Sequence, residues 1–396
     1  MKTSNLITEY KKVYTFILII ITTIIFYQYR GALYNKFNKV YNYYNLTYTN
    51  KLDSISIYAN AYKLQISRYE NYKYTNKTAG IIFDTNKLVI FEQNNINYLI
   101  SYFKLDSLIK KNFIVNFYEP EPIKQIFKYH NNILALLIFN DKKSRFISII
   151  NCTKKFEIFR SENLPINNFL DFNGIGGGVT EFENNLLIGI GVPSAGYNDI
   201  ISELAQNDNS PFGKILIFGP EEIQTKRTDI FSYKIYSKGH RNPQGLFNLN
   251  NTIYEVEHGP RGGDELNIID SGNNYGYPKY SFGKSYDGNS YEIPIDTLNY
   301  KSPIFSYIPS VATSDIIGCP NFIAKLHYPY DCLILSTLKA KSLFILIIDP
   351  KRDKLISQEQ LICDYRIREF QREIKDSIIF STDNYGVYKI DTLIFY

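Results

Sequence analysis

Short apolar runs alternate with polar turn residues along most of the chain. Neighbouring runs meet at Asn, Asp or Gly positions, and each such couplet is typical of a β-hairpin. The couplets lie around residues 85–86, 140–141, 184–185, 250–251 and 384–385, and CLILST with SLFILII forms another. No convincing long amphipathic helix interrupts them from residue 56 onward. The pattern therefore predicts an all-β array.

The number of couplets indicates how the array is arranged. Periodic hairpins over this length favour a β-propeller over a single sandwich, because a sandwich core stops growing sooner. With about fifty to sixty residues for each unit, we expect a six-bladed β-propeller. It would occupy residues 56–396.

An uncharged apolar run, VYTFILIIITTIIFYQY, lies between basic flanks at residues 13–29. As a helix it would reach roughly 25 Å, at the short end of a membrane span. A signal peptide has a similar layout, but no small-residue cleavage site follows, so we predict an uncleaved transmembrane signal anchor. A buried core helix is the alternative. Residues 1–12 would then be a short tail and residues 30–55 a linker.

An N-terminal anchor of this kind most often places the following domain outside the cytoplasm. We therefore expect a single-pass membrane protein whose propeller is periplasmic or extracellular.

Charge and cysteine content narrow the function classes. The 44 basic and 39 acidic residues give a net charge of +5 without a long basic run, so no nucleic-acid partner is expected. The four cysteines lack CxxC spacing, which argues against a zinc site. If the domain is exported, Cys319 and Cys332 are the first pair to test for a disulfide. Four buried thiols are the alternative.

Unusual chemistry is concentrated between residues 237 and 278. Taken singly, its members could be a surface arginine, turn caps and a corner. Together, a Gly-Pro turn, an acidic pair and a tyrosine turn provide the oxygen ligands that suit a hard cation such as calcium. The segment contains Arg241, Asn242, Gln244, Gly259, Pro260, Asp264, Glu265, Tyr275 and Gly276.

Three motifs in this segment carry a family resemblance. GHRNPQGL, EHGPRGGDELN and GNNYGYP resemble the soluble, calcium- and pyrroloquinoline-quinone-dependent glucose/sorbosone dehydrogenases, including the aldose sugar dehydrogenases. AQNDNSPFGKILIF, PSVATS, LSTLKAKSLFIL and RIRE resemble further family segments. The resemblance covers residues 165–396 well and residues 56–164 only in outline.

The resemblance implies a six-bladed propeller with pyrroloquinoline quinone (PQQ) over its central channel. Arg241, Asn242 and Gln244 would face the cofactor. Lys339 would meet its quinone or carboxylate side, and Arg366 and Arg368 would bind its carboxylates. Guanidinium groups suit this role because they hold carboxylates in paired, charge-assisted hydrogen bonds.

The resemblance also implies metal sites. The carbonyl groups of Gly259 and Pro260 would bind a calcium ion that bridges to the quinone. Glu265 and Tyr275 would belong to a second, structural calcium position or would support the loop.

The chain departs from the family at its catalytic base. The family's histidine falls on Gly174, or on Asn173 with a one-residue shift, and a family arginine becomes Gly178. Neither glycine nor asparagine can act as the base. His130 is the spare histidine that could replace it, and Asp171 could serve if its pKa were raised.

Two main functions follow as hypotheses. The first is a membrane-anchored quinoprotein oxidoreductase that oxidises an aldose or related polyol by hydride transfer to PQQ. The second is a catalytically degenerate propeller that acts as a ligand-binding or protein-interaction module. A propeller that binds neither quinone nor metal is a third possibility. No residue pattern identifies the electron acceptor.

Overall fold

The computed structural model describes residues 54–58, 62–69, 77–85, 87–106, 123–140, 143–166, 170–194, 200–286, 291–292, 299–372, 377–383 and 386–395. They belong to one compact unit, residues 54–396. The predicted anchor at residues 13–29 lies outside the described residues. Within the described residues, no helix combines the length and apolarity that crossing a membrane requires.

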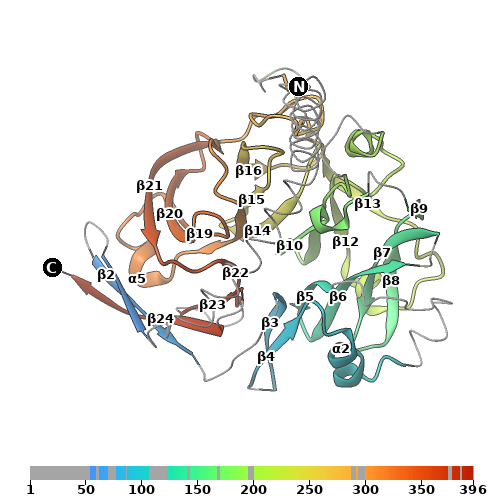
Figure 1. Cartoon of the computed structure of the whole chain (residues 1–396), viewed down its shortest axis with the longest axis horizontal. Coiled ribbons are helices and arrows are strands. Elements are labelled where there is room, and N and C mark those ends of the chain that lie inside the picture. The colour runs from blue at the N-terminus through green and yellow to red at the C-terminus, as the bar shows by residue number, and fades with distance from the viewer. Residues whose placement is uncertain are drawn as a thin grey trace, which may run out of the picture. The chain divides into compact units, whose positions relative to one another are not determined.

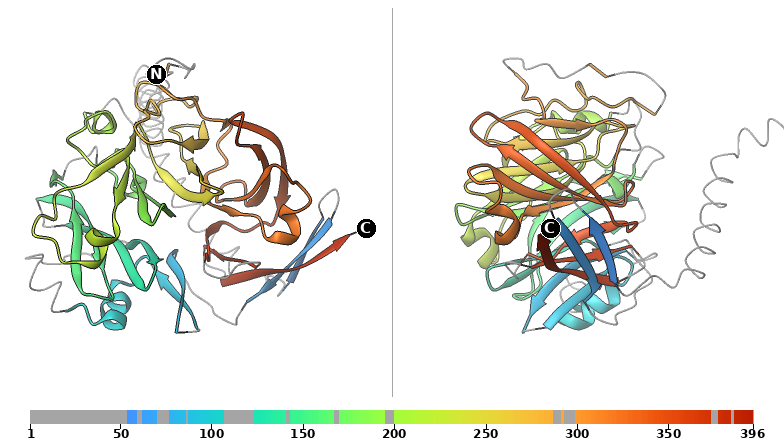
Figure 2. Two further views of the ribbon diagram at one scale, coloured as in Figure 1. Left: turned by 180° about the vertical axis from the view of Figure 1, so that it is seen from behind. Right: turned by 90° about the vertical axis from the view of Figure 1, so that its left-hand side faces the viewer.

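The first and last strands of this unit lie in one sheet. Strand β1 (Ser54–Tyr58) pairs with β2 (Tyr62–Arg68), and β2 pairs with β24 (Gly386–Phe395), all antiparallel. The sheet continues through β23 (Ile378–Thr382) to β22 (Ile367–Phe370). Blue β1 and β2 lie beside red β24 in both views of Figure 2. Early and late parts of the sequence thus share one blade.

Four more antiparallel sheets lie between these ends, in chain order around a common centre (Figure 1). One contains β5 (Ile123–Tyr129), β6 (Asn132–Asn140), β7 (Ser144–Asn151) and β8 (Phe156–Arg160), with β9 (Leu164–Pro165) beside β7. The next contains β10 (Gly176–Phe182), β11 (Asn185–Ile190), β12 (Lys214–Phe218) and β13 (Lys234–Lys238). The third contains β14 (Pro243–Leu249), β15 (Thr252–Glu257), β16 (Asp264–Ile269) and β17 (Phe305–Tyr307). The fourth contains β18 (Thr313–Gly318), β19 (Asp331–Thr337), β20 (Ser342–Asp349) and β21 (Lys354–Ile362).

The prediction of an all-β propeller is confirmed, but the prediction of six blades is wrong for the described residues. They form five sheets of four or five strands and a two-stranded hairpin, β3 (Thr78–Asp84) with β4 (Lys87–Glu92). The hairpin lies between β22 and β5 in the ring of inner strands. After β4 the chain forms helix α2 (Ile96–Phe103), which Asn95 caps by accepting a hydrogen bond from the Tyr98 amide.

The other helical segments among the described residues are short and connect strands. They are the 3₁₀ turns η1 (Phe172–Gly174) and η2 (Ser202–Ala205) and the helices α4 (Pro220–Gln224) and α5 (Asn321–Ala324). Of these, η1 immediately precedes the inner strand β10 and so helps to shape the centre of the propeller.

Asparagine supplies several of the tight turns that the sequence pattern predicted. Asn184 joins β10 to β11, and Asn250 with Asn251 joins β14 to β15, all three at positive φ. Asparagine tolerates this left-handed conformation better than most residues, and two-residue hairpins require it. These local turns fix the register of each hairpin.

Hydrophobic residues fill the spaces between neighbouring sheets. In the largest core cluster, Leu136 and Ile147 of one blade pack with Leu186 and Ile188 of the next. All four are buried. Apolar burial on both faces of the sheets thus holds adjacent blades together.

The inner strands approach one another unusually closely at glycine. A Cβ atom on Gly178 of β10 would lie 2.9 Å from the backbone of Gly245 in β14. A Cβ atom on Gly245 would in turn lie 2.9 Å from the Cα of Asp315 in β18. These contacts are shorter than a side chain permits, so the absence of side chains sets the spacing of three blades.

Cys319 and Cys332 form a disulfide, as the sequence suggested for an exported domain, while Cys152 and Cys363 are buried thiols. The bridge joins the end of the β18 segment to strand β19 across α5. It closes a sequence separation of 13 residues.

Candidate functional site

A polar cavity of about 90 Å³ lies among the inner strands. Residues of β3, β5, β10, β14, β18 and β22 line it. They include the predicted cofactor residues Gln244 and Arg368. Asn173, one of the two positions predicted to match the family histidine, also lines it. Other lining residues are Lys77, Thr78, Gln93, Lys124, Gln125, Gly176, Gly177, Gly178, Val179, Ser314, Asp315, Glu369 and Arg372.

Arg366 and Arg368 are brought together by Asp383. The Arg368 guanidinium donates to both oxygens of Asp383 at 2.8–3.0 Å, and Arg366 Nε donates to Oδ2 at 3.0 Å. Asp383 is buried, whereas the Arg366 side chain is 43% exposed. Both predicted carboxylate-binding arginines therefore already hold a carboxylate of this chain.

The backbone beside Lys339 contacts Arg366. Arg366 Nη1 donates to the carbonyl of Leu338 at 3.2 Å, and Lys339 is the next residue. The Lys339 amide donates to the Val311 carbonyl, and the residue is exposed. It does not line the cavity.

Arg241, Asn242 and Gln244 surround His258. Arg241 Nη1 donates to the His258 carbonyl at 3.0 Å, and Asn242 Nδ2 is 3.3 Å from His258 Nδ1. His258 Nε2 is 2.6 Å from the Thr313 carbonyl, so Nε2 donates there and Nδ1 is left to accept from Asn242. Burial lowers the pKa of His258, which agrees with a neutral ring. Gln244 Nε2 donates to Asn242 Oδ1 at 2.6 Å and so continues the network into the cavity.

The predicted calcium residues Gly259 and Pro260 form a tight loop. The Gly259 amide donates to Asp264 Oδ1 at 3.2 Å, and the Pro260 carbonyl accepts from the Tyr286 hydroxyl at 3.3 Å. Asp264 Oδ2 accepts from Ser310 Oγ and the Ala312 amide at 2.6 and 2.7 Å. Asp264 thus serves to hold the loop.

Glu265 and Tyr275 lie in a different environment. The Tyr275 hydroxyl donates to the Ile268 carbonyl at 2.7 Å and accepts from the Asp270 amide at 3.0 Å. Its ring stacks on His240 with centroids 4.8 Å apart. Glu265 is buried beside Glu257, and desolvation raises its pKa well above the usual range.

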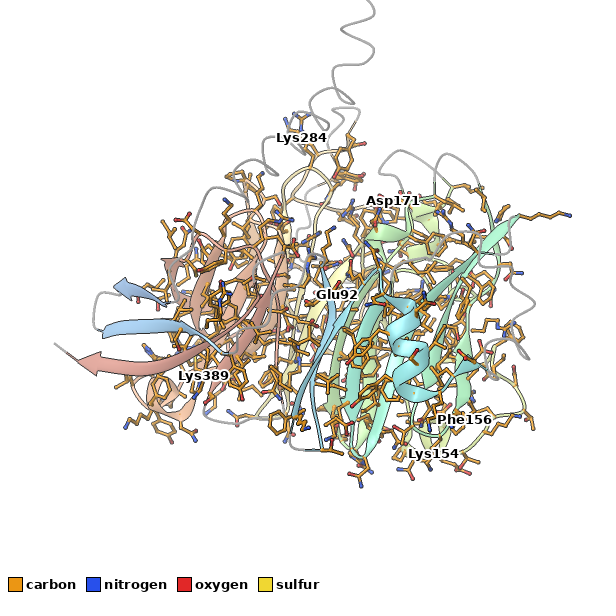
Figure 3. The ribbon with its side chains drawn as sticks, turned by 60° about the horizontal axis from the view of Figure 1, so that its bottom comes forward. Glu92, Lys154, Phe156, Asp171, Lys284 and Lys389 are labelled. Carbon is orange, nitrogen blue, oxygen red and sulfur yellow. A yellow bond between two sulfur atoms is a disulfide. The ribbon has the colours of Figure 1, made fainter. Side chains whose placement is uncertain are left out.

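Asn173 and Gly174, the two positions predicted to match the family histidine, lie in η1. Asp171 caps this turn by accepting from the Asn173 amide at 2.9 Å. Figure 3 shows Asp171 and Lys284 toward one end of the blades and Lys154 toward the other. A Cβ atom on Gly174 would meet only the Val192 carbonyl oxygen, at 3.5 Å, an ordinary contact.

Neither substitute base that the sequence suggested lines the polar cavity. His130 forms an ion pair with Glu181 at 3.3 Å and stacks on Tyr129. It borders a separate cavity of about 410 Å³ together with apolar residues such as Ile81 and Phe127. Asp171 is used as the η1 cap.

Sequence reasoning missed Glu369, which lines the polar cavity. Its Oε2 accepts from Gln125 Nε2 at 3.1 Å, and its buried Oε1 has no hydrogen-bond partner within the described part of the chain. Desolvation raises its pKa to about 7. Its position directly after Arg368 in RIRE was the available signal.

Asp315 and Arg372 form an ion pair on another wall of this cavity. Asp315 also accepts from the Phe370 amide at 2.9 Å. The pair therefore ties β18 to the end of β22.

Known proteins resemble this chain in sequence and in fold. The Glucose / Sorbosone dehydrogenase family model matches residues 173–389. Aldose sugar dehydrogenase of Escherichia coli (strain K12) is 32% identical over 146 residues, covering 34% of this chain and 37% of that protein. The chain spans only about a third of the length of the curated relatives it matches.

Two solved structures share the fold. The apo form of the soluble aldose sugar dehydrogenase from Escherichia coli superposes with a TM-score of 0.61 at 18% identity, covering 83% of this chain and 99% of that one. The PQQ-bound aldose sugar dehydrogenase from Streptomyces coelicolor gives 0.53 at 16% identity, covering 82% and 97%. The family match extends over more than half of the sequence, from η1 to β24. The chain belongs to the Glucose / Sorbosone dehydrogenase family.

Proposed function

We propose that this protein is a quinoprotein-type oxidoreductase that oxidises an aldose or related polyol by hydride transfer to PQQ. The observation that carries the proposal is the polar cavity, where Gln244, Arg368 and the η1 segment meet within the residues that match the family. PQQ is named in the solved relative from Streptomyces coelicolor, which supports the same cofactor here.

The positively charged side chains on one wall of the site suit a ligand that carries several carboxylates. Arg366 and Arg368 present two guanidinium groups held at one point by Asp383. PQQ, when bound, supplies a two-electron acceptor and carries three carboxylic acids. In the proposed complex, Arg366, Arg368 and Lys339 bind these carboxylates, while Arg241, Asn242 and Gln244 line the adjoining wall.

Calcium belongs to the same proposal. The carbonyl groups of Gly259 and Pro260 supply the oxygen ligands that calcium prefers, and the Pro260 oxygen already accepts a hydrogen bond. A calcium ion there would take the place of the Tyr286 hydroxyl.

A proton acceptor is needed for the sugar hydroxyl. We propose Glu369 for this task, because its Oε1 is unpartnered among the described residues and it shares the cavity with Gln244. A carboxyl group whose pKa is about 7 takes up and releases a proton near neutral pH. Gly174 and Asn173 offer no such group.

A catalytically inactive ligand-binding or protein-interaction module is the second candidate function. The absence of a histidine in the Asn173–Gly178 segment favours it. The close contact between Gly178 and Gly245 also excludes an arginine side chain at residue 178 without movement of the two strands.

We further propose that residues 13–29 anchor the protein in a membrane and that the propeller lies outside the cytoplasm. The Cys319–Cys332 disulfide supports an oxidising compartment.

The function can be tested by reconstituting the purified full-length protein with PQQ and calcium. Dye reduction is then followed over a panel of sugars and polyols. We expect a PQQ- and calcium-dependent rise in melting temperature that Arg366→Ala diminishes. Arg352→Ala is the control, because the Arg352 side chain is 79% exposed and pairs with Asp349 outside the cavity. Binding without turnover on any substrate would favour the inactive module. No thermal response to PQQ or calcium would contradict the oxidoreductase and favour a propeller that binds neither.

A further inference from the structure

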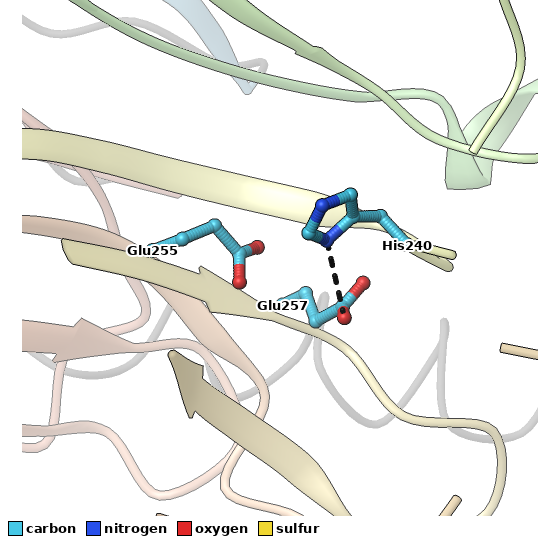
Figure 4. Close-up of side chains that lie close together, drawn as sticks. All are labelled: His240, Glu255 and Glu257. Atoms are coloured by element: carbon cyan, nitrogen blue, oxygen red, sulfur yellow. Dashed lines mark ion pairs between the residues drawn. The ribbon is translucent and has the colours of Figure 1, made fainter. Parts of the chain in front are cut away.

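One histidine and two glutamates, His240, Glu255 and Glu257, form a buried cluster (Figure 4). His240 precedes β14, and Glu255 and Glu257 lie on the neighbouring strand β15. One ligand atom from each residue lies within 4.8 Å of the others. All three side chains are at most 3% exposed, so solvent does not compensate their charges.

His240 and Glu257 are each held by one atom while another atom faces the cluster. His240 Nε2 is 2.9 Å from Ser237 Oγ. Glu257 Oε2 accepts from the backbone amides of Arg241 and Asn242 at 2.6 and 3.0 Å. His240 Nδ1 and Glu257 Oε1 then face each other at 3.7 Å, too far for a hydrogen bond.

Glu255 repeats this arrangement. Its Oε2 accepts from Asn267 Nδ2 at 2.9 Å. Its Oε1 and His240 Nδ1 are both buried without a hydrogen-bond partner in the part of the chain that the structure describes. Buried polar atoms are nearly always partnered, so two such atoms facing one point indicate a missing ligand.

The charge balance of the cluster indicates a cation. Glu265 on β16 also adjoins it, so three buried carboxyl groups share the space with one imidazole. The Arg241 guanidinium, the cation nearest in sequence, donates to the His258 carbonyl. Burying several carboxylates without a counter-charge is strongly unfavourable.

We propose that His240, Glu255 and Glu257 bind one divalent transition-metal ion of the zinc or manganese class. A mixed set of imidazole and carboxylate ligands suits these ions better than calcium, which prefers oxygen alone. Bonds of about 2.0–2.2 Å place two ligands of one ion at most about 4.4 Å apart. Because the ligand atoms lie within 4.8 Å of one another, they need to close by at most a few tenths of an ångström.

The hydrogen bonds that His240 and Glu257 make away from the cluster suit metal binding. A hydrogen bond from Nε2–H to Ser237 leaves the lone pair on Nδ1, which is the form that binds metal. Because the cluster is buried, the ion would be structural. Glu257 carries the Arg241 and Asn242 amides, so the ion would fix the start of the arginine motif.

This site differs from the calcium position at Gly259 and Pro260 and does not depend on the proposed activity. It also lies beside Glu265 and Tyr275, the residues predicted for a second calcium position. Tyr275 uses its hydroxyl in other hydrogen bonds and contributes its ring against His240, while Glu265 borders the cluster.

The test measures metal content and thermal stability of the full-length protein. After chelation, Zn²⁺, Mn²⁺ and Ca²⁺ are added back separately. We expect one Zn²⁺ or Mn²⁺ ion for each chain by elemental mass spectrometry. A melting-temperature rise of about 4 °C is expected at a hundredfold excess over the dissociation constant. Co²⁺ should give an absorption spectrum typical of nitrogen and oxygen ligands.

Two variants distinguish a bound metal ion from protons shared among the carboxyl groups. Glu255→Gln keeps the side-chain shape but should lose the bound ion and its thermal effect, whereas the exposed Glu221→Gln should retain both. If the carboxyl groups share protons instead, the wild type will bind no zinc or manganese, and Glu255→Gln will be at least as stable as the wild type. That result would overturn the proposal. A calcium response that survives in Glu255→Gln, without binding of zinc or manganese, would also overturn it.

Discussion

Asp383 occupies the two arginines that we propose bind the carboxylates of the cofactor. It pairs with both Arg366 and Arg368 from a buried position. An anionic ligand must therefore share these guanidinium groups with a carboxylate that is already present. Charge-assisted pairs of this kind are strong, so the site favours ligands with several carboxylates over those with one.

Glu369→Gln tests the elevated pKa of Glu369. A folded-state pKa of about 7 exceeds the unfolded value, so the wild type loses stability as pH rises from about 4.5 to 7. The loss should be about 2 to 3 kcal/mol between pH 5 and pH 8, and glutamine should remove it. Urea unfolding of both proteins at the two pH values measures the difference. Exposed Glu203→Gln serves as the control, and a pH-independent difference for Glu369→Gln would refute the assignment.

Gly178→Ala tests the close approach of β10 and β14. The new methyl group would lie 2.9 Å from the Gly245 backbone, so the strands must separate. We expect a loss of about 1 to 3 kcal/mol in unfolding free energy. Gly174→Ala, whose methyl group makes an ordinary 3.5 Å contact, should cost less. Equal losses would show that the backbone adapts freely at residue 178.

Gly174→His places an imidazole at one of the two positions predicted to match the family's base. The backbone there has room for a Cβ atom, so the variant should fold. We expect it to create or increase PQQ-dependent sugar oxidation by about 10²- to 10⁴-fold, the usual contribution of a general base. Dye reduction measures the gain. An inert variant that still binds PQQ would argue against this alignment of the η1 segment.

Individual elements reveal what local sequence can predict. The hairpins at Asn184 and Asn250 were predicted because turn chemistry is local. The helix α2 was missed because the hairpin pattern was extended past Asn95, where a side-chain cap begins a helix.

The site was predictable in part for the same reason. Gln244 and Arg368 lie in short motifs and meet in the cavity as expected. The partnership of Asp383 with the arginines depends on the pairing of β22 and β23, and the exposure of Lys339 depends on tertiary packing. Neither can be derived from nearby residues alone.

The disulfide element should contribute measurably to stability. Cross-linking residues 13 apart restricts the unfolded chain, with an expected effect of about 3 kcal/mol. Reduction, or the double change Cys319→Ala with Cys332→Ala, should lower the urea midpoint accordingly. A reducing agent should not affect the double variant. An unchanged midpoint after verified reduction would contradict this expectation.

At the scale of the whole molecule, closure depends on the blade that joins early and late strands. A chain that begins at residue 70 lacks β1 and β2 and leaves the β24 edge unpaired. We expect lower stability and self-association, because an exposed strand edge offers unpaired hydrogen-bonding groups. Size-exclusion chromatography and urea unfolding against a chain that begins at residue 54 would measure both. A stable monomer from residue 70 would show that β22–β24 suffice.

The pairing of β2 with β24 also limits when this blade can be completed during synthesis. Arg68 and Tyr388, which face each other across β2 and β24, are 320 residues apart. At about 5 to 20 residues per second, a ribosome needs roughly 15 to 65 seconds to make the intervening chain. Strand β2 can pair with β1 early, but its other partner, β24, is made only after this interval. During synthesis, one edge of β2 therefore stays unpaired until the last strand of the blade is made.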